Sequence, residues 1–430
     1  MEEHDCISIF YPTSDCLQLG NSMFPSLRES HRTYVDKTQF ISQWLRDGYL
    51  VTILLRPRRF GKTLALSTVH AFFTVDHPEY AALFEGTKVD SDTEAKRLQN
   101  QVPVIFLSFH SIEVKEPDEI RSAIARTIQE VYQDFLSSVP AGALDQKTKE
   151  ELSVFSESSK SDMIAHSLRK IMKVMEKTYG QKVMVLIDEY DHVMYPLFQK
   201  PGWDEVCDLL RAFMEATFKD NSSLMKGLIT GITAIGQGSI FSGFNHCGIA
   251  DVQSGLFGDC FGFSQEEVDR LLEENHLEDS RALVKKWYDG YSFGQNRHMY
   301  NPWTMLNFIH DRRLGMFWAN SGGTELLEHV IRSAPCRVMD EFLLLLFGKT
   351  LHRPLCGQLV MQDLPEDGAS VYTLAVSTGY LSCEWDGKAG SSVQRMYRLR
   401  VANLECLTDL KQKIRRWYFG PSSEKSAAFR

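Results

Sequence analysis

The sequence lacks the features that mark secreted, membrane-spanning and zinc-ribbon proteins. Its nine cysteines include no Cys-x-x-Cys pair, and a disulfide framework is not expected in a chain of 430 residues. The longest apolar run, Phe342–Phe347, is far shorter than the roughly 20 residues of a bilayer-spanning helix, so we expect it in a core. The N-terminus, Met1–Asp5, is acidic where a secretory signal is basic. We therefore expect a soluble, intracellular protein of the cytoplasm or nucleus, with no membrane partner.

An excess of basic charge is also missing. The formal net charge is -9 and the pI is near 5.8, within an otherwise ordinary globular composition of 43% hydrophobic and 24% charged residues. This balance argues against a protein covered in basic surface for nucleic acid. Net charge says nothing about local patches, so nucleic acid stays open as a partner without support from charge.

What is present is an alternation of short apolar runs and longer amphipathic segments between Tyr34 and Phe263, which predicts an α/β fold. The runs are apolar on both faces, as in buried parallel strands. The expected strands are Leu50–Leu55, Val104–Phe109, Val183–Ile187 and Gly227–Thr230, and the expected crossover helices are Lys62–Phe73, Glu119–Leu136, Asp162–Tyr179 and Glu205–Phe218. The polar segment Asp145–Lys160 is expected to be an exposed loop or a solvated helix.

The pattern changes after Phe263. Ser264 and Glu267 form a capping box, which predicts the start of a helical region over residues 264–347. A small α+β or winged-helix-like region is expected over residues 348–420. Its predicted parts are strands at Ser370–Val376 and Met396–Val401 and a hairpin turn at Asp386–Lys388. Residues 1–22 and 421–430 are expected to be tails.

One segment carries the signature of a phosphate-binding loop. Gly61-Lys62-Thr63 follows a predicted strand and opens a predicted helix, the context in which backbone N–H groups and a lysine hold phosphates. The glycine that usually stands five positions earlier is missing, because Arg56 occupies that position. Taken alone, the segment is equally a basic turn with Lys62 in solvent.

A second motif favours the phosphate-loop interpretation. The apolar run Val183–Ile187 ends in Asp188 and Glu189, at the edge where α/β sheets bind ligands. Asp188 is expected to hold magnesium through water, and Glu189 to orient and deprotonate the attacking water. The alternative is a strand that ends in solvated acids.

A polar pair completes the predicted site. In ATPases with a glutamate after the magnesium-binding aspartate, a strand lies between the two motifs and places a polar side chain near the γ-phosphate. Thr230 and Thr233 are the candidates for this sensor position, although a turn-forming threonine explains each equally well. Gly236–Gly238 lacks the third glycine of a dinucleotide fingerprint, so that interpretation is set aside.

Several strings together resemble the AAA-ATPase-like family, whose members often carry a C-terminal nuclease module of the PD-(D/E)XK type. The resemblance runs from about Met23 to Ala319 and rests on Tyr34–Thr38, Arg56–Thr63, Asp188–Asp191, Ser239–Gly243, Trp287–Tyr291 and Tyr300–Trp303. It implies a P-loop domain over residues 23–263 and a helical lid over residues 264–347. The family loop regularly has arginine at the position of Arg56.

The resemblance also implies the site residues. The implied nucleotide-binding set is Arg58, Arg59, Phe60, Gly61, Lys62, Thr63 and Leu64, with Thr63 and Asp188 at magnesium and Glu189 as the base. The two arginines are expected either to touch phosphate or to anchor the loop to acidic neighbours. Tyr34–Thr38 is expected near the adenine or in the core, and the aromatic residues of Trp287–Tyr291 and Asn301–Trp303 either stack on bases or pack the lid.

A nuclease module is not expected. Asp386-Gly387-Lys388 and Asp409-Leu410-Lys411 spell half of the required motif, but such triplets arise freely by chance and too few residues follow the second for a nuclease core.

The preferred interpretation is an additional-strand P-loop ATPase that binds ATP with Mg²⁺ and switches its lid between two arrangements. The alternatives are a nucleotide-binding regulatory protein that does not hydrolyse ATP, and the ATPase part of a nucleic-acid-processing system. A protein partner or self-association stays open. No arginine finger is predicted, because ordinary surface pairing is favoured for both Arg211 and Arg281.

Overall fold

The structure, a computed structural model, describes residues 17–234, 247–321, 325–357, 359, 364, 366–389 and 395–419. Residues 1–16 of the first predicted tail, the whole 421–430 tail, and the strings Gly236–Gly238 and Ser239–Gly243 lie outside the described residues.

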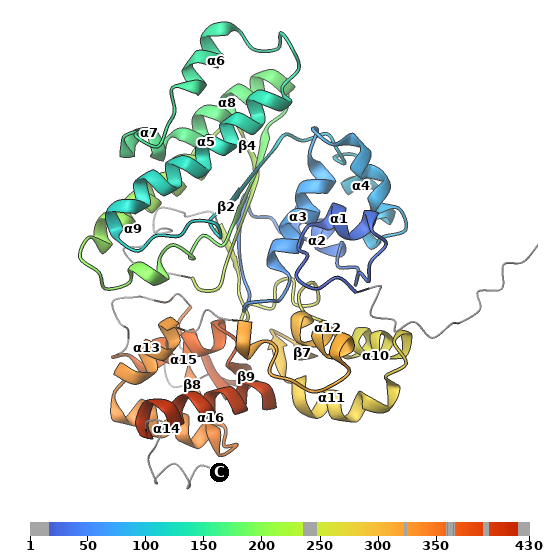
Figure 1. The fold of residues 1–430 in the computed structure, drawn as a ribbon, viewed down its shortest axis with the longest axis vertical. Helices are drawn as coiled ribbons and strands as arrows, with labels where there is room; N and C mark the ends of the chain where they lie inside the picture. Colours follow the sequence, from blue (N-terminus) through green and yellow to red (C-terminus); the bar gives the residue numbers. More distant parts are fainter. Residues whose placement is uncertain are drawn as a thin grey trace, which may run out of the picture.

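The region over residues 23–263 contains a five-stranded parallel sheet (Figure 1). The strand order is β2-β3-β4-β1-β5, and the strands are β1 (Val51–Leu55), β2 (Val104–Ser108), β3 (Val183–Asp188), β4 (Leu224–Gly231) and β5 (Cys247–Ala250). β4 therefore lies between β1 and β3, which confirms the predicted additional strand. β5 was not predicted, because its four residues include no run of large apolar side chains.

Helices cover both faces of this sheet (Figure 1). One face carries α1 (Phe24–Glu29), α2 (Gln39–Leu45), α3 (Lys62–Phe73) and α4 (Thr93–Lys96), and the other carries α5 (Ile120–Ser138), α6 (Gln146–Ser153), α7 (Ser161–Ala165), α8 (Ser167–Tyr179) and α9 (Trp203–Phe218). The predicted helix over Asp162–Tyr179 is interrupted at His166, and the polar segment Asp145–Lys160 contains α6, whose one buried side chain is Leu152. Short 3-10 helices lie at Pro78–Phe84, Lys88–Ser91, Pro117–Glu119, Tyr195–Leu197, Glu278–Ser280 and Ala319–Ser321.

The region over residues 264–347 begins where the sequence predicts. Ser264 accepts a hydrogen bond from the Glu267 N–H (3.3 Å), and its own N–H donates to the Glu267 carboxylate (2.8 Å), which confirms the capping box. The helices are α10 (Gln265–Glu274), α11 (Arg281–Tyr288), α12 (Pro302–Asp311), α13 (Glu325–Ser333) and α14 (Cys336–Leu346). The region is not purely helical, because β6 (Tyr291–Phe293) and β7 (Asn296–Met299) form an antiparallel hairpin.

The apolar run Phe342–Phe347 lies at the end of α14 and is only partly in the core. Phe342, Leu345 and Leu346 are buried, whereas Leu344 and Phe347 are 47% and 67% exposed. A helix turns successive side chains to different sides, so a continuous apolar run cannot be buried along its whole length unless the helix is surrounded. Within the described residues, no helix combines the length and the apolar composition that crossing a bilayer requires.

The C-terminal region contains a three-stranded antiparallel sheet in the order β8-β10-β9. Its elements are β8 (Leu351–Pro354), α15 (Gly368–Ser377), β9 (Leu381–Ala389), β10 (Arg395–Val401) and α16 (Leu404–Phe419). The strand predicted at Met396–Val401 is confirmed as part of β10. The strand predicted at Ser370–Val376 is wrong, because these residues form α15 and are all buried. A short apolar run carries no periodicity that separates a surrounded helix from a strand.

The hairpin turn predicted at Asp386–Lys388 is also wrong. These residues lie inside β9, which pairs Trp385 with Tyr397 and Ala389 with Arg395. The pairing is irregular between these two positions, and Gly387 has a positive φ of 71°. Gly387 therefore accommodates a bulge in a continuing strand. A bulge and a tight turn can both require a positive φ, which glycine adopts readily.

Glu405, in the first turn of α16, joins the C-terminal region to the segment before it. The residue is 1% exposed. Its carboxylate accepts hydrogen bonds from the backbone N–H groups of Trp318 (2.6 Å) and Ala319 (3.3 Å) and from the Thr304 hydroxyl (3.0 Å). Burial raises the pKa of Glu405 to about 7, against the lowering effect of these three hydrogen bonds.

Glu405→Gln is expected to change how stability depends on pH. Because the folded-state pKa of about 7 lies above the value of about 4.3 for an exposed glutamate, the unfolded chain releases this proton first as the pH rises. The corresponding stability is fully present below about pH 4.3 and is lost as the pH rises to about 7, a change of about 4 kcal/mol. Urea unfolding at about pH 5 and about pH 8 should show most of this loss in the wild type and not in the variant. Parallel pH profiles for the two proteins would contradict it.

Candidate functional site

The candidate site lies where β1, β3 and β4 end at the same edge of the sheet. The loop after β1 runs from Arg56 to Gly61, and α3 begins directly after it at Lys62. Within the loop Arg59 and Gly61 have positive φ values of 63° and 85°. The unpaired N–H groups of the first turn of α3 therefore face the same edge, where a helix N-terminus favours an anion.

Lys62 is held against this loop. Its side chain is buried, and its ammonium donates hydrogen bonds to the carbonyl oxygens of Arg56 (2.9 Å) and Pro57 (3.1 Å). Burial lowers the pKa of Lys62, while the nearby carboxylates of Glu189 and Asp191 act in the opposite direction. Lys62 is thus a cation kept inside the loop by carbonyl groups, with acidic side chains close by.

Two predicted site residues, Thr63 and Thr230, contact a third, Asp188. The Thr63 hydroxyl donates a hydrogen bond to one carboxylate oxygen of Asp188 (2.8 Å), and the Thr230 hydroxyl donates to the other. Burial raises the pKa of Asp188, and the hydrogen bonds from Thr230 and Thr63 oppose that shift. The Thr63 hydroxyl and the Asp188 carboxylate together offer the hard oxygen ligands that Mg²⁺ prefers, so these residues fit the predicted ion.

The second sensor candidate, Thr233, belongs to a different cluster. Its N–H donates to the buried carboxylate of Asp191 (3.0 Å), as does the N–H of Ile232 (2.8 Å). Tyr195 also donates its hydroxyl proton to Asp191. Asp191 thereby fixes the segment after β4 to the end of β3. No role was predicted for Asp191, although it stands three residues after Asp188 in the Asp188–Asp191 string.

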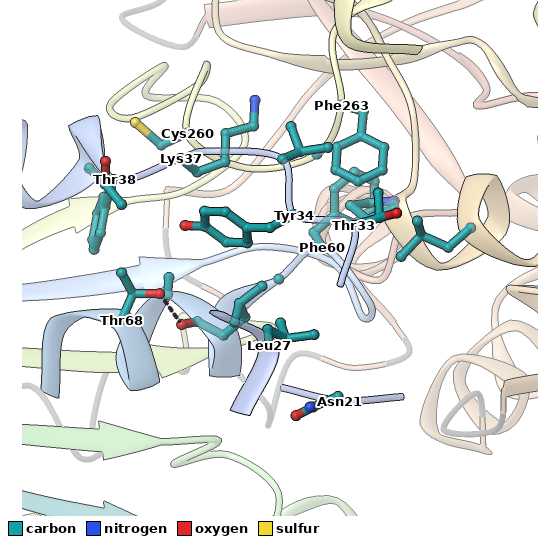
Figure 2. A pocket seen from close by; sticks show the side chains of 18 of the residues that line it. Asn21, Leu27, Thr33, Tyr34, Lys37, Thr38, Phe60, Thr68, Cys260 and Phe263 are labelled. Carbon is teal, nitrogen blue, oxygen red and sulfur yellow. Dashed lines mark hydrogen bonds between the residues drawn. The ribbon is translucent and has the colours of Figure 1, made fainter. Parts of the chain in front are cut away.

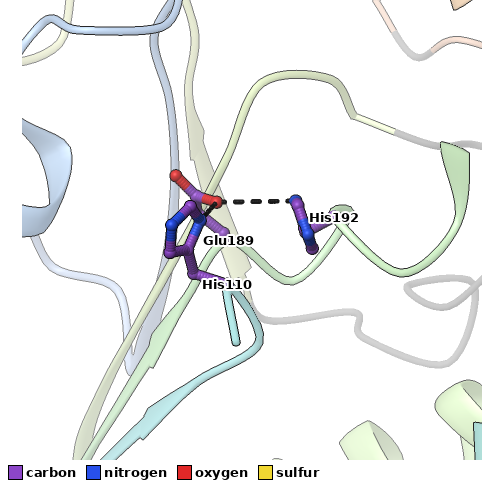
Figure 3. Close-up of side chains that lie close together, drawn as sticks. All are labelled: His110, Glu189 and His192. Carbon is purple, nitrogen blue, oxygen red and sulfur yellow. Dashed lines mark hydrogen bonds and ion pairs between the residues drawn. The ribbon is translucent and has the colours of Figure 1, made fainter. Parts of the chain in front are cut away.

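The Glu189 side chain points toward two histidines (Figure 3). Its Oε2 atom lies 2.8 Å from His110 Nδ1 and 3.7 Å from His192 Nδ1. The backbone of Glu189 has a positive φ of 52°, and its N–H donates to the Thr230 hydroxyl (3.3 Å). Neither histidine was predicted. His110 could have been found, because it stands two residues after the end of β2, at the same edge of the sheet as Glu189.

The remaining loop residues pack rather than project into an open site. Arg56 is fully buried, and its guanidinium donates to the carbonyl oxygens of Leu55 (2.8 Å), Ala250 (2.7 Å) and Leu256 (2.5 Å). Phe60 lies edge-on to Tyr291 (centroids 4.9 Å apart). The loop is therefore anchored on one side to β5 and the segment that follows it, and on the other to the β6–β7 hairpin.

The two arginines that follow Arg56 contact tryptophans of the neighbouring region. The Arg58 guanidinium lies 5.2 Å from the Trp318 ring centroid, and that of Arg59 lies 4.5 Å from the Trp303 ring centroid. The Trp318 indole N–H also donates to the Arg58 carbonyl (3.3 Å). Both contacts are of the cation–π type and hold the loop against the residues around α12.

A mostly apolar cavity of about 120 Å³ adjoins the phosphate loop (Figure 2). Tyr34 lies across it, between Lys37 and Leu27. The wall on the α3 side includes the loop residue Gly61 and three residues of the helix, Leu64, Ala65 and Thr68, and the opposite wall includes Phe263 and Leu306. Tyr34 both lines this cavity and packs edge-on against Phe24 (5.5 Å), so the two interpretations of the Tyr34–Thr38 string do not exclude each other.

The two arginines weighed as fingers lie in surface ion pairs. Arg211 is 2.7 Å from the Asp208 carboxylate. Arg281 is 2.8 Å from both Asp269 and Glu273. The Arg211 pair lies within α9, whereas Arg281 at the start of α11 pairs with two residues of α10.

Comparison with known proteins places this site in a family. Residues 18–241, more than half of the chain, match the family described as "Predicted AAA-ATPase". The chain is also 25% identical over 402 residues to the "Uncharacterized protein in vnfD 5'region" of Azotobacter chroococcum mcd 1, an alignment that covers 93% of this chain and 69% of that protein. The match over residues 18–241 spans the Arg56–Gly61 loop, the Asp188–Glu189 strand end and Thr230, and the chain belongs to the predicted AAA-ATPase family.

Proposed function

We propose that this chain is a magnesium-dependent ATPase whose nucleotide state changes how the region over residues 264–347 packs on the P-loop domain. The observation that carries the proposal is the meeting of the Thr63 hydroxyl, the Asp188 carboxylate and the Thr230 hydroxyl beside Lys62. The family supports ATP binding in general. The finer assignments below follow from the chemistry of the residues.

Lys62 and the start of α3 supply the positive end of the site. When phosphate is present, the Lys62 ammonium would exchange its two carbonyl partners for phosphate oxygens, which are stronger acceptors because they are charged. Thr63 and Asp188 would hold Mg²⁺, directly or through water. The ion, when bound, withdraws charge from the transferred phosphoryl group.

Glu189 would act as the general base on water. Its side chain is 30% exposed, so water can reach it. Thr230 would position both acids, because its hydroxyl donates to Asp188 and accepts from the N–H of Glu189. To reach water on the phosphate side, Glu189 would turn away from His110.

The apolar cavity beside Gly61 would receive the base of the nucleotide. The cavity is lined by Gly61 and by α3 residues from Leu64 onward. A nucleotide with its phosphates on the loop could therefore place its base in this cavity. The lining also includes Pro302 and Leu306, which belong to the 264–347 region. A nucleotide seated here would touch the two regions together.

The contacts of Arg58 and Arg59 with Trp318 and Trp303 would transmit the change. The Asn301 amide also donates to the Arg58 carbonyl (3.2 Å). Gly379, with φ of 94°, lies so near that an added Cβ would be 2.9 Å from Pro57. A shift of the loop on phosphate binding would therefore displace the neighbouring region, and lid movement is proposed on this basis.

Lys62→Ala is expected to weaken ATP binding by roughly 100-fold, equivalent to about 2.7 kcal/mol, because two charge-assisted hydrogen bonds to phosphate are lost. Binding of a fluorescent ATP analogue to the purified chain, with Mg²⁺ present, measures this. Lys200→Ala is the matched control, because Lys200 is an exposed lysine paired with Glu116 (2.9 Å) in the same domain. Equal affinity of wild type and Lys62→Ala would refute the phosphate-loop assignment.

A role in nucleic-acid processing is the second candidate. We propose a winged-helix-like C-terminal region, because β8, α15, β9 and β10 follow one another with the sheet order β8-β10-β9. In DNA-binding relatives of that architecture a helix enters the major groove. Here α15 would be that helix, but Ser370–Val376 are all buried, so the geometry favours a packing role. A rate of phosphate release raised by added DNA or RNA would reverse this preference.

A further inference from the structure

The cluster of His110, Glu189 and His192 has the composition of a transition-metal site. Within the described parts of the chain it is the one group in which three potential ligand atoms from His, Cys, Asp or Glu lie within 4.8 Å of one another. The three side chains come from two adjacent strand ends and the turn after β3, and they converge on one point (Figure 3). Because all three are partly exposed, an ion can reach them from solvent.

The spacing suits a small ion. Zinc bound at about 2.0–2.1 Å in tetrahedral geometry holds neighbouring ligand atoms roughly 3.3 Å apart. The measured separations from Glu189 Oε2, 2.8 Å to His110 Nδ1 and 3.7 Å to His192 Nδ1, lie on either side of that value. Small rotations of exposed side chains would therefore complete the site, with the fourth position left to water.

The backbone around the cluster is fixed. Glu189 is held with φ of 52°, a conformation that costs an L-residue energy and persists only where the surroundings enforce it. The His192 N–H donates to the Glu189 carbonyl (3.0 Å), and the N–H of Tyr190 donates to the Thr230 carbonyl (3.0 Å). This turn places the carboxylate of Glu189 and the ring of His192 on the same side.

The ligand types separate this cluster from the magnesium site beside it. Thr63 and Asp188 offer oxygen atoms only, which suit Mg²⁺, whereas imidazole nitrogens favour Zn²⁺ and related first-row ions. The two neighbouring acids also have different partners: Asp188 accepts from the Thr63 hydroxyl, whereas Glu189, held at a positive φ just after β3, pairs with His110. The two clusters can therefore bind different ions.

We propose that His110, Glu189 and His192 bind one divalent transition-metal ion of the zinc class. A consequence rests on the proposed function: an ion that holds the Glu189 carboxylate prevents it from acting as a base, so metal binding and ATP hydrolysis oppose each other. This makes the cluster an inhibitory site that reads the availability of the metal.

Equilibrium dialysis of the purified full chain against Zn²⁺, with Mg²⁺ in excess, tests the site. The wild type should bind one Zn²⁺ per chain, and His110→Ala and His192→Ala should each lose this binding. Because a direct ligand is removed, the affinity should fall by more than the roughly 10- to 100-fold that follows removal of a residue that only supports a ligand. His352→Ala is the matched control, because His352 is an exposed histidine 2.8 Å from a single carboxylate, Asp386. Unchanged far-UV circular dichroism would show that the variants fold.

The outcomes separate the metal site from the ATPase assignment. Lys62→Ala should keep the Zn²⁺ site, because Lys62 is not a ligand. Zinc bound equally by the wild type and both histidine variants overturns the proposal, whatever the protein does with ATP. Zinc that binds at this site but leaves phosphate release by the wild type unchanged overturns the inhibitory role alone. Inhibition of the wild type that is relieved in His192→Ala supports both.

Discussion

Glu189→Gln is expected to lower the rate of phosphate release by about 10²- to 10⁴-fold, the usual contribution of a general base, while ATP binding is retained. Glutamine has the shape of glutamate and can keep a hydrogen bond to His110, but it cannot accept a proton from water. The variant leaves the Thr63–Asp188 pair unchanged, so nucleotide and magnesium should still bind. Single-turnover phosphate release with saturating ATP measures the effect on the chemical step.

Two further variants locate the effect at Glu189. Glu157→Gln removes an exposed carboxylate that pairs with Arg126 (2.8 Å) in the same domain, and its phosphate release should match that of the wild type. Asp188→Asn should instead weaken magnesium-dependent ATP binding, because a ligand of the ion is lost. Equal rates of phosphate release by the wild type and Glu189→Gln would contradict the role of Glu189 as the base. They would favour the alternative of a nucleotide-binding regulatory protein.

The sheet was predictable because its strands carry their own signal. β1 and β3 are buried on both faces, and β2 is buried along most of its length, so all three appear as apolar runs in the sequence. The acidic pair at the end of β3 and the Gly61–Thr63 signature, six residues after β1, were found because each lies close to such a run. Because β4 lies between β1 and β3, Thr63, Asp188 and Thr230 come together at the ends of neighbouring strands.

The rest of the site depends on contacts between distant segments. His110 and His192 reach Glu189 from different sides, and no spacing in the sequence announces that they meet. Arg58 and Arg59 were expected to contact phosphate or acids. Instead, their guanidinium groups contact the rings of Trp318 and Trp303, which stand more than two hundred residues further along the chain. Ser370–Val376 was predicted as a strand because it is a short, largely apolar piece, whereas the structure buries all seven residues in the helix α15.

Arg56→Gly, which restores the usual glycine of a phosphate loop, is expected to destabilise this protein by about 3–5 kcal/mol. The positive φ values of the loop fall at Arg59 and Gly61, so the backbone at position 56 does not require glycine. Burial lowers the pKa of Arg56 to about 10, still well above neutral pH, so the guanidinium is charged. Glycine would leave the carbonyl groups of Ala250 and Leu256 without these donors and would open a cavity beside Phe261 and Phe293.

Two more substitutions at this position separate hydrogen bonding from packing. Arg56→Met fills most of the volume but donates nothing, so it should recover part of the packing loss only. Arg56→Lys keeps the charge, but a single ammonium cannot reproduce the planar fork that reaches Ala250 and Leu256, and it should lie below the wild type. Urea unfolding of the four proteins measures the free energies. A glycine variant as stable as the wild type would show that the arginine does not anchor the loop. We expect the wild type to have the highest free energy of unfolding and the glycine variant the lowest. The reason is that the Arg56 guanidinium fixes the loop to β5 and the segment after it, and glycine removes these contacts.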